Sequence, residues 1–326
     1  MRRRAAVVLA LAAWLAAAAF AHAAPEPFRD GGDPASLLRA ARLARSGLSG
    51  ESPARRRLLE AMVAGLREGG PVEAILAAHA RAGAPSSVLL TGYYEPTLAA
   101  RRHRGGGFRY PVYAVPGEPA LRGLSRRAID AGALAGRGLE LFWLQDPIEV
   151  FFLHVQGSGR LELERGARAR VGYAGDNGHA YHSIGKELVS RGVLAASQAT
   201  APAIKRWLRR HPERTSEILQ TNPRFIFFRE IEAPPGVGPP GALGVPLVAF
   251  RSVAADPEVV APGTVGLLTA TLPDGTSLRR VVVAMDAGAA IRGPARLDLF
   301  LGAGRRAELL AGELRARSRV VWLKPR

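Results

Sequence analysis

Apolar side chains in the first part of the chain recur at helical spacing. Between residues 33 and 84 they fall three and four positions apart, which places them on one face of an α-helix. Asp33 followed by Pro34 is a typical helix start, because an aspartate caps free N–H groups and proline fits the first turn. The run Gly69-Gly70-Pro71 interrupts the pattern. The sequence therefore predicts helices over residues 33–84 with a break near residue 70.

From residue 86 onward the apolar positions form short runs rich in valine and aromatic residues, which is typical of β-strands. The longest run, residues 139–155, is interrupted by Gln145-Asp146-Pro147 and predicts two strands joined by a turn. Residues 160–164 and 167–173 alternate in polarity and predict a pair of adjacent strands.

Helical spacing returns at residues 183–194 and 199–220. After residue 222, short β runs separated by turn residues continue to the end of the chain, except in the loop Pro234–Pro240, where proline and glycine exclude regular structure. Short strands separated by about 8–12 residues indicate a small closed barrel or a sandwich.

The amino terminus has the pattern of a secretory signal. Arg2-Arg3-Arg4 precede an apolar run ending at Phe20, and Ala21-His22-Ala23 matches a cleavage site. We expect residues 1–23 to be removed; an uncleaved membrane anchor is the alternative, although the run is short for a span. The chain has no cysteine, which excludes disulfides, thiolate metal sites and lipid attachment at a cysteine. A soluble periplasmic protein is expected, with outer-membrane association left open.

The formal net charge is +17, and loss of three arginines with residues 1–23 leaves +14. A basic exported protein favours an acidic partner, such as cell-wall glycan with its carboxylates, an anionic polymer or phospholipid head groups. Nucleic acid is not expected, because the basic residues are dispersed and no aromatic recognition signature accompanies them. The alternative is that the arginine content reflects codon bias alone.

Three aspartates in the last quarter of the chain are candidates for chemistry. Asp286 closes the apolar run 281–285, and Asp298 follows within Leu297 to Phe300. A carboxylate at the end of a buried strand must be paired, hydrogen-bonded or used in catalysis. Asp256 precedes a proline and is interpreted as a turn cap. The other two form a candidate acid–base pair.

A second cluster of polar residues is a weak candidate for a metal site. Asp176, His179 and His182 have a tempting spacing, but no further ligand pattern accompanies them. No metal and no cofactor are therefore expected, and no Ser-His-Asp arrangement is readable.

Four motifs carry a resemblance to a known family: Thr91 to Pro96 (TGYYEP), His154 to Gly159 (HVQGSG), Asn222 to Phe228 (NPRFIFF) and the three-aspartate region. In this order, over residues 85–324, the chain resembles the membrane-bound lytic murein transglycosylase A family. The resemblance implies a mainly β fold, in which a double-psi β-barrel made from two chain segments carries an inserted second β domain and N-terminal helices. It places a glycan-binding groove between the two domains.

On this resemblance the chain divides into four parts: a signal peptide (1–23), a helical segment with the first part of the barrel (24–96), an inserted β domain (97–221) and the three-aspartate barrel domain (222–326). The family cleaves the β-1,4 bond between N-acetylmuramic acid and N-acetylglucosamine without water and leaves 1,6-anhydromuramoyl ends. The implied partners are peptidoglycan glycan strands, with cell-wall synthesis or division complexes as further candidates. A monomer is expected.

Matching to the family motifs implies roles for individual residues. Asp298 becomes the acid that then acts as the base, and Asp286 the supporting aspartate. Seven residues are predicted to bind substrate: Thr91, Gly92, Tyr93, Tyr94, Gln156, Gly157 and Ser158. The alternatives are that Asp298 caps a barrel turn, that the two tyrosines belong to a strand's core and surface, and that residues 156–159 form a plain turn.

The environment of Asp298 predicts how the acid stays protonated. Its apolar neighbours and the charge of Asp286 raise its pKa, while Arg296 opposes them. Two positions depart from the family pattern, since Ala289 replaces a glycine and Arg292 a lysine; the added methyl of Ala289 is expected to narrow the groove or to require a different φ. Two other functions stay open: a peptidoglycan-binding module without catalysis, and a hydrolase of the same fold.

Overall fold

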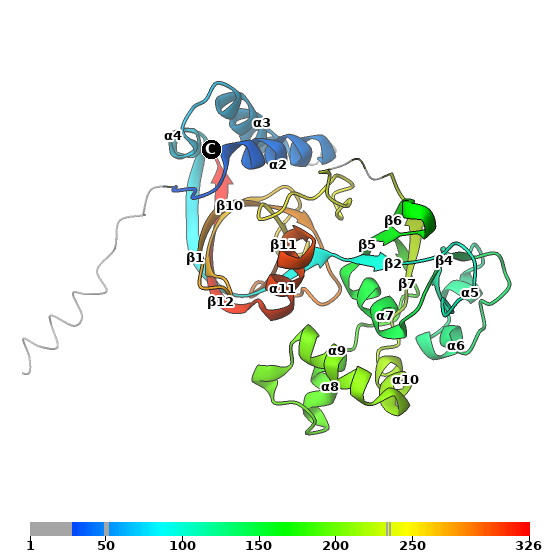
Figure 1. Cartoon of the computed structure of the whole chain (residues 1–326). Coiled ribbons are helices and arrows are strands. Elements are labelled where there is room, and N and C mark those ends of the chain that lie inside the picture. Colours follow the sequence, from blue (N-terminus) through cyan, green and yellow to red (C-terminus); the bar gives the residue numbers. More distant parts are fainter. Residues whose placement is uncertain (1–27, 49–51, 233, 235) are drawn as a thin grey trace, which may run out of the picture.

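The structure, a computed structural model, describes residues 28–48, 52–232, 234 and 236–326. The predicted signal segment, residues 1–23, lies outside the described residues. Figure 1 shows a closed barrel with the N-terminal helices on one side and a second body of strands and helices on the other. Within the described residues, no helix is both long and apolar enough to cross a membrane.

The N-terminal segment folds into three helices that pack on the barrel: α2 (Pro34–Gly47), α3 (Pro53–Arg67) and α4 (Val72–His79). The predicted start is confirmed, because the Asp33 carboxylate accepts hydrogen bonds from two N–H groups of the first turn of α2. The predicted end at residue 84 is wrong. β1 already begins at Ala80, because pairing with the last strand from Pro325 inward overrides the local pattern.

The barrel is closed by six strands in the order β1-β11-β8-β10-β9-β12. Their bounds are β1 (Ala80–Glu95), β8 (Ser252–Ala254), β9 (Val265–Thr271), β10 (Ser277–Asp286), β11 (Arg296–Ala303) and β12 (Arg315–Pro325). The pairs β1–β11 and β8–β10 are parallel, and the others are antiparallel. Leucine and valine side chains fill the interior, and α11 (Arg305–Glu313) packs on the same core. The barrel is thus built from β1 and from β8–β12, with the second body between them in sequence.

The second body has a four-stranded sheet in the order β2-β5-β6-β7 and a separate pair β3–β4. The strands are β2 (Thr97–Ala99), β3 (Tyr110–Tyr113), β4 (Glu140–Leu144), β5 (Ser158–Glu162), β6 (Arg168–Asp176) and β7 (Ile226–Glu230). The helices are α5 (Pro119–Arg122), α6 (Arg126–Asp130), α7 (Pro147–Gln156), α8 (Ile184–Ser190), α9 (Ala201–Arg210) and α10 (Pro212–Gln220). The predicted pairing of β5 with β6 and the helical stretches after residue 183 are confirmed. Since β7 pairs with β6, this sheet extends past residue 221; the domain boundaries stay a prediction.

One predicted strand is wrong. The second half of the apolar run 139–155 forms helix α7, which Asp146 caps and Pro147 begins. Gly157, with φ of 75°, ends the helix in the left-handed conformation that favours glycine. Most of its side chains are buried between the four-stranded sheet and the helices α8–α10, so it has no broad polar face. An apolar run of this kind looks like a buried strand in sequence.

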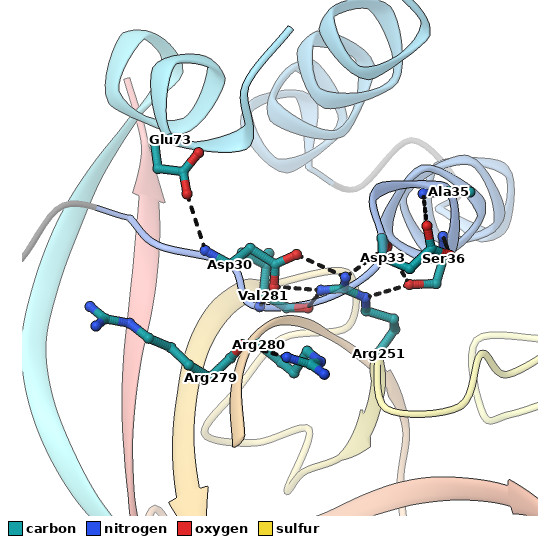
Figure 2. A network of polar contacts seen from close by, with 9 residues as sticks. All are labelled: Asp30, Asp33, Ala35, Ser36, Glu73, Arg251, Arg279, Arg280 and Val281. Atoms are coloured by element: carbon teal, nitrogen blue, oxygen red, sulfur yellow. Dashed lines mark hydrogen bonds and ion pairs between the residues drawn. The ribbon is translucent and has the colours of Figure 1, made fainter. Parts of the chain in front are cut away.

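A buried ion pair ties the residues before α2 to the barrel (Figure 2). Arg251 precedes β8 and Asp30 precedes α2, and each side chain is only 1% exposed. The guanidinium donates to both Asp30 carboxylate oxygens at 2.8 Å, and also to Ser36 Oγ and to the carbonyls of Asp33 and Val281. Asp30 Oδ1 further accepts the N–H of Val281 in β10. The N-terminal segment is thereby bonded to β10 and to the residue that precedes β8.

Candidate active site

Asp298 lies in the middle of β11, directly beside Thr91 of the parallel strand β1. The Thr91 hydroxyl donates to Asp298 Oδ1 at 2.8 Å. Arg296 Nη2 donates to the same hydroxyl oxygen at 3.4 Å, so the hydroxyl proton is left to point at the carboxyl group. The parallel register thus brings together two residues that are 207 positions apart in sequence.

The pKa of Asp298 is raised to about 7, chiefly because surrounding protein atoms desolvate the carboxyl group. The negative charge of Asp286 raises it further, whereas the Thr91 hydrogen bond and the charge of Arg296 lower it. The predicted competition is present, and desolvation prevails. Solvent in the groove still reaches the side chain, which is partly exposed. The result is a carboxyl group that can hold a proton near neutral pH where a ligand could meet it.

Asp286 ends β10 and is held by three donors. Tyr93 donates its hydroxyl to Oδ2 at 2.7 Å, and the N–H groups of Ala242 and Ala287 donate to Oδ1 at 2.8 and 2.9 Å. Burial raises the pKa of Asp286, and these hydrogen bonds oppose the rise. The short strand β8 lies between β10 and β11, and its Ala254 is paired with both aspartates. The two carboxyl groups therefore lie on the two strands that flank β8, both level with Ala254.

Asp256 has the predicted capping role. Its carboxylate accepts the N–H of Gly293 at 2.7 Å and that of Glu258 at 3.2 Å. The hydrogen bond from Gly293 is the largest cause of a lowered pKa for Asp256. The side chain joins the loop after β8 to the loop that follows Asp286. Asp256 therefore stays ionised and shapes the barrel loops.

A groove with a volume of about 750 Å³ lies between the barrel and the second body. Of the predicted site residues, six line it: Asp286, Asp298, Tyr93, Gln156, Gly157 and Ser158. Thr91, Gly92 and Tyr94 are not among its lining residues. A Cβ on Gly92 would lie 2.5 Å from Leu301 Cδ1, so this glycine faces the packing of the barrel against α11. The Tyr94 hydroxyl donates to Glu308, on the exposed side of the same helix. For these three residues, the lining of the groove does not support the predicted direct contact with glycan.

Two predicted groove residues also have structural contacts. The ring of Tyr93 packs against that of Phe300, with 5.3 Å between the ring centroids, while the Tyr93 hydroxyl donates to Asp286. Gln156, the last residue of α7, accepts the N–H of Tyr94 through Oε1 at 3.0 Å. Ala289, which replaces the family glycine, also lines the groove. Among the described non-glycine residues, positive φ is confined to Arg165 and Phe250, so the alanine adopts its backbone without strain.

Sequence reasoning missed several groove residues. The loop at residues 234–240 is predicted only to be irregular, yet Pro239 and Pro240 line the groove, and Ala242 just after it donates its N–H to Asp286. Four arginines also line the groove: Arg126, Arg224, Arg229 and Arg292. The density of proline and glycine was the only available signal for the loop at residues 234–240. Arg224 and Arg292 belong to the family motifs, but nothing in the local sequence distinguishes Arg126 and Arg229 from the many other arginines.

The candidate metal residues have other partners. Arg224 and Tyr173 bind the carboxylate of Asp176, and the ring of His179 contacts the carbonyl of Gly123. His182 contacts Glu187. The described part of the chain contains no group of three potential metal ligands.

Comparison with known proteins identifies the family to which this architecture belongs. Two family models match: the MltA specific insert domain over residues 89–229 and the 3D domain over residues 251–324. The crystal structure of E. coli MltA with bound chitohexaose is similar, with a TM-score of 0.80, 31% sequence identity and coverage of 92% of both chains. The chain belongs to the membrane-bound lytic murein transglycosylase A family. Its barrel is therefore the double-psi β-barrel of that family, with a second domain and N-terminal helices.

Other members of the family agree. A membrane-bound lytic murein transglycosylase from Agrobacterium tumefaciens has a TM-score of 0.79 at 31% identity, covering 90% of this chain and 93% of that one. The curated membrane-bound lytic murein transglycosylase A of E. coli strain K12 is 36% identical over 247 residues, which is 73% of this chain. That alignment spans 66% of the relative, slightly less than two thirds of its length.

Proposed function

We propose that the protein is a lytic murein transglycosylase that uses Asp298 as its single acid and base. The observation that carries this proposal is the environment of Asp298. Burial raises its pKa to about 7, it is oriented by Thr91, and it lines the groove between the barrel and the second body. A glycosidic oxygen needs a proton before it can leave, and this carboxyl group holds one near neutral pH.

In the proposed reaction, Asp298 gives one proton to the leaving group and takes another from the attacking hydroxyl. Asp298 donates its proton to the glycosidic oxygen, and the bond from that oxygen to the anomeric carbon of N-acetylmuramic acid breaks. The 6-hydroxyl oxygen of the same sugar forms a bond to that carbon. The Asp298 carboxylate then accepts the 6-hydroxyl proton and is ready for another cycle. The attack is intramolecular, so it benefits from a high effective molarity and needs no second carboxylate as nucleophile.

The contacts of Asp286 favour a supporting role over that of a nucleophile. Its two oxygens already accept three hydrogen bonds, from Tyr93, Ala242 and Ala287. A retaining hydrolase would need one of those oxygens free to attack the anomeric carbon. We therefore place Asp286 as the residue that holds Tyr93 and raises the pKa of Asp298.

Glycan strands are the proposed substrate of the groove. Tyr93, Gln156, Gly157 and Ser158 line it and are the proposed glycan contacts. The E. coli relative was crystallised with chitohexaose, a chain of linked sugars, which supports a groove for extended glycan. The signal pattern in residues 1–23 supports export and a soluble periplasmic location. N-terminal sequencing of the mature protein tests this location, and a chain that still begins at Met1 contradicts it.

The pH dependence of the rate tests the role of Asp298. The acid must be protonated, so kcat/KM for murein strands is expected to fall as pH rises through about 7. Asp286→Asn removes a negative charge that raises the pKa of Asp298, so the fall should begin at lower pH. The displacement should be small, because Asp286 contributes least among the causes of the shift.

Asp274→Asn is the matched control, since Asp274 lies in the exposed turn between β9 and β10. Its profile should coincide with that of the wild type. An alkaline limb that stays in place in Asp286→Asn would show that Asp286 is only structural. A wild-type rate that already falls as pH rises through about 4, the pKa of a free aspartate, would remove Asp298 as the acid.

A further inference from the structure

A buried ion pair lies where the chain passes between the barrel and the second body. The first passage follows Glu95, the last residue of β1, and the second lies in the segment that returns from β7 to β8 and contains Val237. Arg170 of β6 contacts both passages. Figure 1 shows β1 extending from the barrel toward the four-stranded sheet that contains β6.

The geometry of this contact is that of a fully desolvated clamp. Arg170 is 2% exposed and Glu95 is 0% exposed. Arg170 Nη2 donates to Glu95 Oε2 at 2.7 Å and to the carbonyl oxygen of Val237 at 3.0 Å, while Nε donates to Glu95 Oε1. Only the planar fork of a guanidinium can bind both carboxylate oxygens in this way. One side chain therefore joins the two passages to each other.

A third residue provides an internal comparison. Arg160 of β5 donates through Nε to Glu95 Oε2 at 2.8 Å, but its side chain is 43% exposed. No hydrogen bond links its guanidinium to the described residues of the returning segment. Arg160 thus shares the carboxylate with Arg170 and contacts the first passage alone.

The position of this clamp connects it to the groove. Thr91 and Tyr93, which bind the two aspartates, lie on β1 just before Glu95. The groove has Asp286 on the barrel side and Ser158 on the second body, so its width depends on how the two bodies are held. A buried ion pair is weak evidence for stability, since its desolvation offsets much of its attraction. Fixing the relative orientation of two bodies is a role that suits such a pair better.

We propose that Arg170 is a positioning residue that holds both passages through Glu95 and Val237 and thereby sets the width of the groove. This inference rests on the proposed function for its effect on glycan strands, although the geometry of the clamp does not depend on it. Arg170 itself is not among the residues that line the groove.

Steady-state kinetics of Arg170→Lys provide the first test. Lysine keeps the charge but lacks the fork, so it cannot hold both Glu95 oxygens and Val237 together. We expect KM for murein strands to rise about tenfold while kcat stays within about threefold, since a misplaced wall weakens binding more than the chemistry in the barrel. Arg160→Lys is the matched control and should leave both constants within about twofold.

Distance measurements provide the second test and need no activity. The chain has no cysteine, so Ser216→Cys on α10 and Thr276→Cys in the turn before β10 can be spin-labelled selectively. Arg170→Lys should broaden the distribution of distances between the labels, and Arg160→Lys should not. If Arg170→Lys does not fold, Glu95→Gln takes its place with the same expectations.

An unchanged distance distribution overturns the inference, as does a KM that stays within about twofold of the wild type. A loss confined to kcat also overturns it, because it would indicate an effect on the chemistry alone. If no variant, including the wild type, forms product, then the proposed function fails, and the label distances alone decide the clamp.

Discussion

Asp298→Asn is expected to abolish turnover and to leave glycan binding within a few-fold of the wild type. The amide keeps the shape of the side chain, and its oxygen can still accept the Thr91 hydrogen bond. It has no transferable proton, and loss of a general acid or base typically costs about 10²–10⁴ in rate. Release of soluble muropeptides gives the rate, and binding to purified glycan strands gives the affinity.

Asp274→Asn serves as the matched control, because it makes the same change in the exposed turn between β9 and β10 and Asp274 does not line the groove. It should retain the wild-type rate. If Asp298→Asn kept more than about a tenth of the wild-type rate, Asp298 would not be the acid. Asp286 would then be the next candidate.

Asp30→Asn is expected to destabilise the fold severely. The change removes the only charged partner bonded to the Arg251 guanidinium in the described residues, and that guanidinium is 1% exposed. Removing one partner of a buried pair typically lowers the free energy of unfolding by about 3–5 kcal/mol, because the other charge is left uncompensated. Urea unfolding followed by circular dichroism measures the loss.

Asp33→Asn is the control for this variant. Asp33 is exposed and caps α2, and asparagine caps a helix about as well as aspartate, so the free energy of unfolding should change by less than about 0.5 kcal/mol. A loss below about 1 kcal/mol for Asp30→Asn would show that the network in Figure 2 contributes little to stability.

The parts of the fold that sequence predicted well have local signals. Asp33 with Pro34 marks the start of α2, and the alternation across residues 160–173 marks the pair β5–β6. Helix α7 was missed because most of its side chains are buried, which leaves no broad polar face of the kind that distinguishes a helix. Asp146 with Pro147 was in fact the start of that helix, but the same two residues also suit a turn.

The site was predicted as residues but not as an arrangement. The family motifs named Asp286 and Asp298, and both line the groove. The same motifs contain Thr91 and Tyr93, whose hydroxyls bind these aspartates. Those pairings depend on the register of strands about 200 residues apart in the chain, which no local pattern encodes. Glu95 likewise acquires its role only when β1, β5 and β6 come together.

The mass of the products of murein digestion tests cleavage without water most directly. The purified mature protein would be incubated with murein sacculi, and the released fragments would be analysed by mass spectrometry beside those from Asp298→Asn. We expect fragments whose muramoyl ends are one water lighter than reducing ends, and none from the variant, because the 6-hydroxyl of the sugar replaces water as nucleophile. Fragments with ordinary reducing ends would contradict this and indicate a hydrolase, and binding without any fragments would indicate a module that only binds peptidoglycan.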